Sequence, residues 1–200
     1  MKKIVALSII LGWVSLSAYD AAHLKKALEE KECIGCDLRG ANLSKMDFSG
    51  GYFSKSDLSG ADLRESVFEM GDFNDCNLSG AKAQGAVFWK ASIRHSDLRG
   101  LHGKGSNFKG SHLERSDLSR ADIRGAKVWK ADFTDAILFK TDFRGSEIGG
   151  SKFIRNDLRF ANLKNTLLWE THFSDVVMTK AQCAHAKKEE AVFEANVTCR

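Results

Sequence analysis

The residues with the clearest capacity for chemistry are five cysteines, of which Cys33 and Cys36 form a CxxC motif. Such a pair exchanges thiols and disulfides when one of its thiols has a lowered pKa. No alternation of strands and helices of the thioredoxin kind surrounds the motif, so we favour a structural disulfide here. Cys183 and Cys199 could pair likewise near the C-terminus, and Cys76 is expected to be a buried free thiol.

Other side chains do not form a catalytic constellation. The six histidines are scattered without metal-ligand spacing or a serine or cysteine partner. No glycine-rich phosphate loop is present. A series of acidic residues and one asparagine recurs every twenty residues and invites interpretation as a calcium site, but hydrogen bonding to local backbone at turns is the more common role of such residues. We therefore expect no enzyme activity, no metal and no cofactor. The series is Asp37, Asp57, Asn77, Asp97, Asp117 and Asp157.

Three of the four tryptophans recur at a spacing of forty residues. Trp89, Trp129 and Trp169 belong to a series, taken every twenty residues, that also contains Lys109. We call the surface that carries this series the tryptophan face. Exposed aromatic rings about 10 Å apart, with Lys109 between two of them for a cation–π contact, favour binding of a protein or a carbohydrate. The alternative is that the rings only shield strand edges.

A second series, also taken every twenty residues, is mostly basic. It favours either an anion-binding stripe or, more simply, a solvated surface balanced by neighbouring aspartates. The formal net charge of +4 is too small to imply a nucleic-acid partner. The members of the series are Arg64, Gln84, Lys104, Arg124, Arg144 and Lys164.

All these series follow from one repeat, which must position them. From Leu38 to Cys183 one mostly hydrophobic position recurs every fifth residue, thirty times, and we call it the inward position because we expect it to point into the core. Twenty-seven of these thirty positions hold Leu, Ile, Val, Phe or Met. A period of five matches neither a helix nor a strand, so the chain predicts a repeat architecture. The exceptions are Ala83, Gly103 and Cys183.

The residues that lie twenty apart are also alike. The series that begins with Leu38 is leucine until Met178, and the series that begins with Phe53 is mostly phenylalanine. Such segregation is expected if four repeats close one coil and like side chains stack on like. Ala83 and Gly103 then leave a gap in the core, and we expect Leu101 to fill part of it because it replaces the usual small residue.

Runs such as Ala41-Asn42-Leu43 and Ala61-Asp62-Leu63 resemble the A(D/N)LXX consensus of the pentapeptide-repeat family. The resemblance implies an all-β solenoid: a right-handed quadrilateral β-helix, here of about seven and a half coils, with a short N-terminal capping helix. Some members of the family are implicated in protecting topoisomerases by mimicking duplex DNA. That role requires a strongly acidic surface, which this chain lacks.

The two ends of the chain differ from the repeat. Residues 1–18 read as a signal peptide, with Lys2 and Lys3 before a short apolar run and small residues for cleavage. Residues 19–35 predict a capping helix, 36–183 the β-helix and 184–200 a closing segment. We expect no stable membrane span after cleavage, because the apolar run is short. Capped ends favour a monomer.

These observations favour an exported, non-enzymatic scaffold that binds a protein or an envelope polymer through its tryptophan face. The periplasm is the simplest location, with an organelle lumen or the extracellular space as alternatives. A purely structural protein without a specific ligand is one competing interpretation. A thiol-redox protein that uses Cys33 and Cys36 is another.

Overall fold

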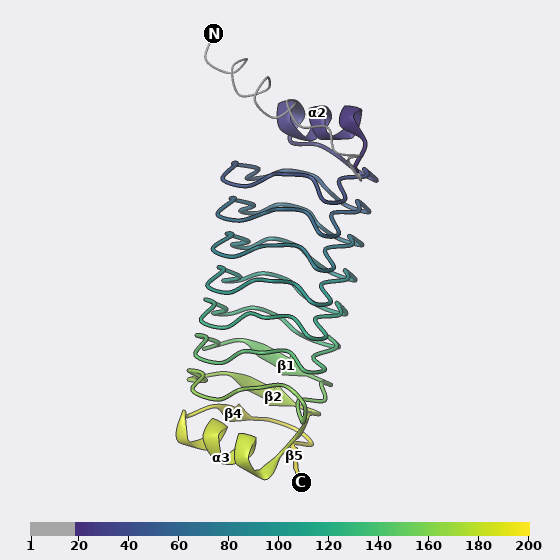
Figure 1. The fold of residues 1–200 in the computed structure, drawn as a ribbon. Helices are drawn as coiled ribbons and strands as arrows, with labels where there is room; N and C mark the ends of the chain where they lie inside the picture. Colours follow the sequence, from purple (N-terminus) through teal and green to yellow (C-terminus); the bar gives the residue numbers. More distant parts are fainter. Residues whose placement is uncertain (1–18) are drawn as a thin grey trace.

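The protein is a rod of stacked coils with a helix at each end, as the computed structural model of the chain shows for residues 19–200 (Figure 1). The predicted signal peptide lies outside the described residues. Helix α2 spans Ala21–Glu30, and Asp20 caps it by accepting hydrogen bonds from the backbone N–H groups of Ala22 and His23. Leu24 and Ala27 of α2 are buried in the same hydrophobic cluster as the inward residues of the coils. Within residues 19–200 no helix is long and apolar enough to cross a membrane.

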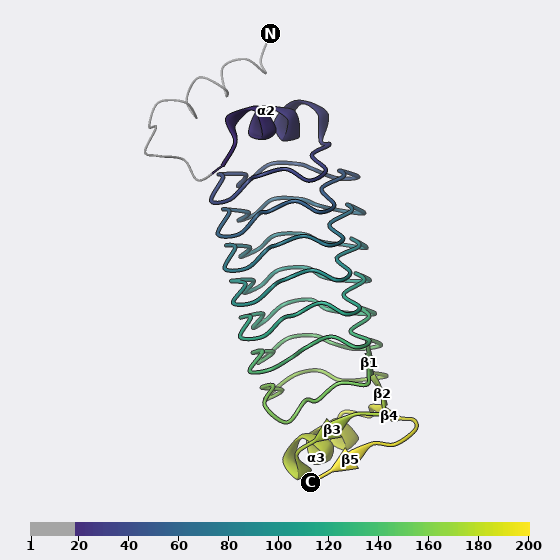
Figure 2. The ribbon, with the colours of Figure 1, turned by 90° about the vertical axis from the view of Figure 1, so that its right-hand side faces the viewer.

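Each coil contains four pentads, because parallel bridges join residues that are twenty positions apart. Asp57 bridges to Asn77, which bridges to Asp97, and the same spacing holds on the other faces (Figure 2). The backbone N–H of Leu58 donates to the carbonyl of Asn77 at 2.7 Å. These bonds form a ladder along each face, which explains why a chain without proline suits this fold.

The corners of the coil require a left-handed backbone conformation at the last position of most pentads. Gly60 has φ 65° and Lys55 has φ 62° there. Glycine adopts this conformation without a steric cost, which is why it is common at the corner position of the repeat.

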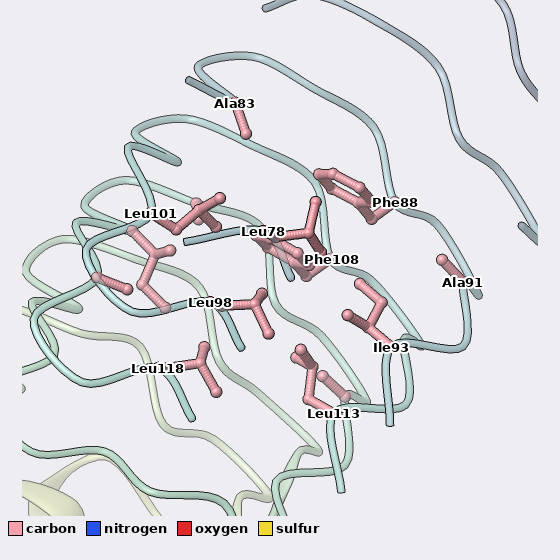
Figure 3. Close-up of a cluster of buried hydrophobic side chains, with 14 of the residues drawn as sticks. Leu78, Ala83, Phe88, Ala91, Ile93, Leu98, Leu101, Phe108, Leu113 and Leu118 are labelled. Atoms are coloured by element: carbon pink, nitrogen blue, oxygen red, sulfur yellow. The ribbon is translucent and has the colours of Figure 1, made fainter. Parts of the chain in front are cut away.

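The core is filled by the inward residues, which stack on their equivalents one coil away. Phe68 stacks on Phe88 with ring centroids 5.1 Å apart, and Phe88 stacks on Phe108 at 5.0 Å. Leu78, Leu98 and their equivalents stack along the column on the opposite side of the core (Figure 3). Dense stacking of like side chains accounts for the segregation of Leu from Phe in the sequence.

Leu101 occupies the space that Gly103 leaves in the core. Its side chain is buried, and a Cβ added at Gly103 would lie 3.3 Å from Leu101 Cδ2. Ala83 lies one coil earlier in the same column (Figure 3). The expectation that Leu101 compensates for these two small residues agrees with this packing.

The repeat ends earlier than the sequence pattern predicts. The prediction carried the pentads to Cys183, but helix α3 spans Lys180–Lys188. Thr179 and Gln182 form a capping box at the start of α3, and this capping favours a helix over a further pentad of the repeat. Gln182 Nε2 also donates to the carbonyls of Leu158 and Ala161, so α3 is tied to the last complete coil.

Short strands complete the C-terminal end. Strands β1 (Lys152–Ile154), β2 (His172–Ser174) and β4 (Val192–Phe193) form one parallel sheet. Strand β3 (Val177–Met178) pairs with β5 (Thr198–Cys199) in a second. His172 pairs with Val192, so the chain resumes the register of twenty after α3.

One face of the rod has an interrupted ladder between its last two coils. Asn156 stands where the repeat usually has a small residue, and its Nδ2 donates to the carbonyls of Phe133 and Ala136. Its Oδ1 is buried without a partner among the described atoms. Three backbone bonds that recur in the preceding coils are not formed here within residues 19–200: Leu138 N to Asp157 O, Lys140 N to Arg159 O and Asp157 N to Ala136 O.

The substitution Asn156→Ser is expected to raise the free energy of unfolding by about 1 kcal/mol or more. A serine hydroxyl would still reach a backbone carbonyl, while the unpartnered amide oxygen disappears and the ladder is free to close. Urea unfolding measures the change. Hydrogen exchange at the Leu138 and Lys140 amides should slow in the variant, and exchange as fast as in the parent chain would contradict this account.

Candidate binding surfaces

The tryptophan face brings two of its three rings into contact. The ring centroids of Trp129 and Trp169 lie 6.2 Å apart, closer than the spacing of about 10 Å expected for rings two coils apart. The reason is Gly149, between them on the face. A Cβ added there would lie 3.0 Å from the Trp129 ring, so the absence of a side chain lets this ring lean toward Trp169.

Polar contacts fix the orientation of Trp129. Its Nε1 donates to Glu147 Oε2 at 3.0 Å, which satisfies the one polar atom of the indole. Trp169 is 48% exposed, and Leu167 beside it is also exposed. Trp129 and Trp169 therefore form an aromatic pair, with Trp129 held by a hydrogen bond and the exposed Leu167 two residues before Trp169 in the chain.

Trp89 stands apart from this pair, and its cationic neighbour differs from the prediction. Lys90 Nζ lies 4.5 Å from the centroid of the Trp89 ring. Lys109 was expected to make such a contact, but among the described residues the cation over this ring is Lys90. Lys90 follows Trp89 directly in the chain, at the corner of the coil, and this places its ammonium group over the ring. The side chain of Lys109, one coil away, is exposed.

The CxxC motif is a closed and buried disulfide. Cys33 and Cys36 are bonded, with their Cα atoms 5.4 Å apart, and both residues are buried. A buried disulfide is a poor substrate for attack by an external thiolate, so this geometry favours a structural role over redox exchange. Cys183 and Cys199 form the second disulfide.

Cys76 is a buried free thiol. Its Sγ lies 2.9 Å from the carbonyl oxygen of Phe53, to which it donates. Burial raises the pKa of this thiol to about 12, so it stays protonated and unreactive.

The aspartates at the outward positions serve the backbone and neighbouring arginines. Asp57 accepts from the backbone N–H of Ser59 at 2.9 Å, as expected for residues that stabilise turns. In the described part of the chain, no group of three or more His, Cys, Asp or Glu side chains is arranged to hold a metal ion.

The three arginines of the basic series are neutralised by neighbouring aspartates. Arg64 donates to both oxygens of Asp62, and Arg124 does the same to Asp122. The arginine hydrogen bond lowers the pKa of Asp62 and of Asp122, against the opposing effect of partial burial. This pairing favours a solvated surface over an anion-binding stripe.

Sequence reasoning missed an apolar group on the face opposite the tryptophans. Ile137, Phe139 and Phe160 are 54%, 39% and 54% exposed, and the two phenylalanine ring centroids lie 5.2 Å apart. Two departures from the repeat indicate this group in the sequence. Ile137 replaces the Asp or Asn of the series that begins with Asp37. Phe160 occupies the corner position that is glycine in four earlier coils, at Gly40, Gly60, Gly80 and Gly100.

The profile of the pentapeptide-repeat family ("Pentapeptide repeats") matches the chain in eight copies, over residues 32–69, 72–102, 104–138, 116–153 and 157–187. The chain therefore belongs to the pentapeptide-repeat family, whose members are right-handed quadrilateral β-helices. A comparison with curated protein sequences finds no match.

Solved structures of pentapeptide-repeat proteins are similar to this chain at low sequence identity. HetL from the cyanobacterium Nostoc, involved in heterocyst differentiation regulation, is 17% identical over 88% of this chain and 92% of its own, with a TM-score of 0.41. The plasmid-mediated fluoroquinolone resistance protein QnrB1 is 18% identical over 78% and 95%, with a TM-score of 0.47. A protein from the Arabidopsis thaliana thylakoid lumen is 25% identical over 56% and 67%, with a TM-score of 0.16.

Proposed function

We propose that this protein is an exported, non-enzymatic scaffold that binds a protein or an envelope polymer through Trp129 and Trp169. The observation that carries the proposal is the contact between these two rings, together with the exposure of Trp169 and Leu167. Aromatic rings that are held in place lose little conformational entropy on binding, which makes them effective contact residues. Export rests on the apolar N-terminal segment and is in keeping with two disulfides.

A purely structural role is the second candidate, and one observation favours it. Trp129 lies on Gly149 and its Nε1 is bonded to Glu147, so part of this ring is covered by the chain itself. In that case the rings protect the strand edges and bind nothing. The exposure of Trp169 and Leu167, which this role does not require, favours the binding function.

The test is quenching of tryptophan fluorescence by iodide in the oxidised protein that lacks residues 1–18. We expect cell-envelope fractions to protect the rings from iodide. The double variant Trp129→Ser/Trp169→Ser should lose binding to these fractions by about a hundredfold, in line with the loss of two central aromatic contacts.

Trp89→Ser is the matched control, because Trp89 lies on the same face but outside the pair. It should keep its binding, and far-UV circular dichroism should be the same for all three proteins. Binding that survives in the double variant would leave the structural role as the better explanation.

A further inference from the structure

Two cations lie over the aromatic rings of the apolar group opposite the tryptophan face. Lys140 Nζ lies 5.3 Å from the centroid of the Phe139 ring, and the guanidinium carbon of Arg159 lies 5.6 Å from that of Phe160. Arg159 is also paired with Asp157, at 2.6 Å, so part of its charge is compensated. The guanidinium of Arg200 is a further positive group near Asp157.

The change in character is abrupt along one corner of the rod. The corner series, taken every twenty residues, begins with four glycines and then becomes basic and aromatic. Bulky and charged side chains therefore gather on the C-terminal half of this corner only. The series is Gly40, Gly60, Gly80, Gly100, Arg120, Lys140, Phe160 and Lys180.

A cavity of about 570 Å³ adjoins the aromatic pair, between the last coil and α3. Phe160 and Arg159 form one side of it, while Lys164 and His185 belong to its polar lining. No carboxylate lines this cavity in the part of the chain that the structure describes. Its charge therefore suits a ligand that carries a phosphate or another anion.

We propose that the C-terminal end of the rod docks on an anionic phospholipid surface, with Ile137, Phe139 and Phe160 entering the headgroup layer. Cations beside the rings then contact lipid phosphates, and the adjoining cavity receives one headgroup. Shallow insertion of a few apolar side chains, together with basic residues, is the usual basis of peripheral membrane binding.

An acidic protein partner fits these observations less well. Three exposed apolar side chains on a flat face and corner supply much less contact area than the roughly 800 Å² per partner of a stable protein interface. A second copy of the chain would bring the same cations together and be repelled. A lipid surface requires neither a large area nor a complementary shape. The proposal does not depend on the tryptophan face, which lies on the opposite side.

The test is sedimentation of the protein with vesicles of phosphatidylglycerol and phosphatidylcholine, at low and high salt. Phe139→Ser/Phe160→Ser should lower the partition coefficient of the protein onto these vesicles by about tenfold or more. Tyr52→Ser/Met70→Ser is the matched control, since these residues are 57% and 60% exposed but lie in the N-terminal half. All the proteins lack residues 1–18, as in the fluorescence experiment, so the comparison isolates the aromatic pair.

A second variant reports on insertion directly. Phe139→Trp should show a component of tryptophan fluorescence, absent from the parent chain, that brominated lipids quench and that high salt restores. The proposal is overturned if the phenylalanine variant binds as well as the control, or if neutral phosphatidylcholine vesicles bind equally. It is also overturned if polyglutamate binds through these residues while vesicles do not, because that result assigns the surface to an acidic protein.

Discussion

Replacement of Leu101 by alanine is expected to lower the free energy of unfolding by about 2–5 kcal/mol. Leu101 is fully buried at a position where most pentads have a small residue, and it fills the core beside Gly103. Neighbouring coils are held at the spacing of the backbone ladder, so they cannot collapse into the space that the substitution creates. The cost should therefore lie well above that of a surface substitution.

Urea unfolding of the oxidised protein measures this effect, and a double-mutant cycle with Gly103→Ala tests its cause. In the parent chain the added methyl group would meet Leu101 Cδ2 at 3.3 Å and Ile123 Cγ2 at 3.2 Å, so it should destabilise. In the Leu101→Ala background one of these contacts is gone and the methyl group fills part of the cavity, so Gly103→Ala should cost less. A loss below about 1 kcal/mol for Leu101→Ala would refute the compensation between Leu101 and Gly103.

The inward half of the structure could be predicted from the sequence because steric constraint is strongest there. A coil of fixed spacing permits only certain side chains at each inward position. The leucine series from Leu38 and the phenylalanine series from Phe53 therefore record the four-sided coil, and the bridges between residues twenty apart bear this out.

The end of the repeat was harder to locate. Cys183 continues the inward pattern and is buried, yet it belongs to α3 because one side of a helix can also present a residue to the core. Thr179 and Gln182 form a capping box that the sequence already contained. The periodicity alone outweighed this local signal and led to the wrong boundary.

Outward side chains could be assigned to a face but not to their contacts. The direction in which Trp129 leans depends on the missing side chain at Gly149 and on the position of Glu147, one coil away. The pairing of Phe139 with Phe160 joins two different positions of the pentad. Neither is determined by the period, so the candidate surfaces needed the three-dimensional structure.

The largest effect at the ends of the rod is expected from the disulfide between Cys183 and Cys199. It closes a loop with a sequence separation of 16 and joins α3 to β5. For a loop of this length the chain-entropy model gives a stabilisation of about 3 kcal/mol. The Cys33–Cys36 disulfide has a separation of 3, for which the same model gives about 2 kcal/mol. The variant Cys183→Ala/Cys199→Ala should therefore lose more stability than Cys33→Ala/Cys36→Ala in urea.

Removal of the two disulfides should differ more in its effect on association between rods than in its effect on the free energy of unfolding. Without the bond from α3, β5 is held by its pairing with β3 and by local contacts, so the end of the rod opens more often. An open end presents unpaired backbone groups, which favour pairing with a second rod. Sedimentation velocity should detect concentration-dependent dimers of the Cys183→Ala/Cys199→Ala variant. Cys33→Ala/Cys36→Ala should form no more dimers than the parent chain, because the adjoining coil keeps its ladder bonds, such as Cys33 N to Tyr52 O at 2.7 Å. Equal behaviour of the two variants would show that the disulfide at α3 does not protect the end of the rod.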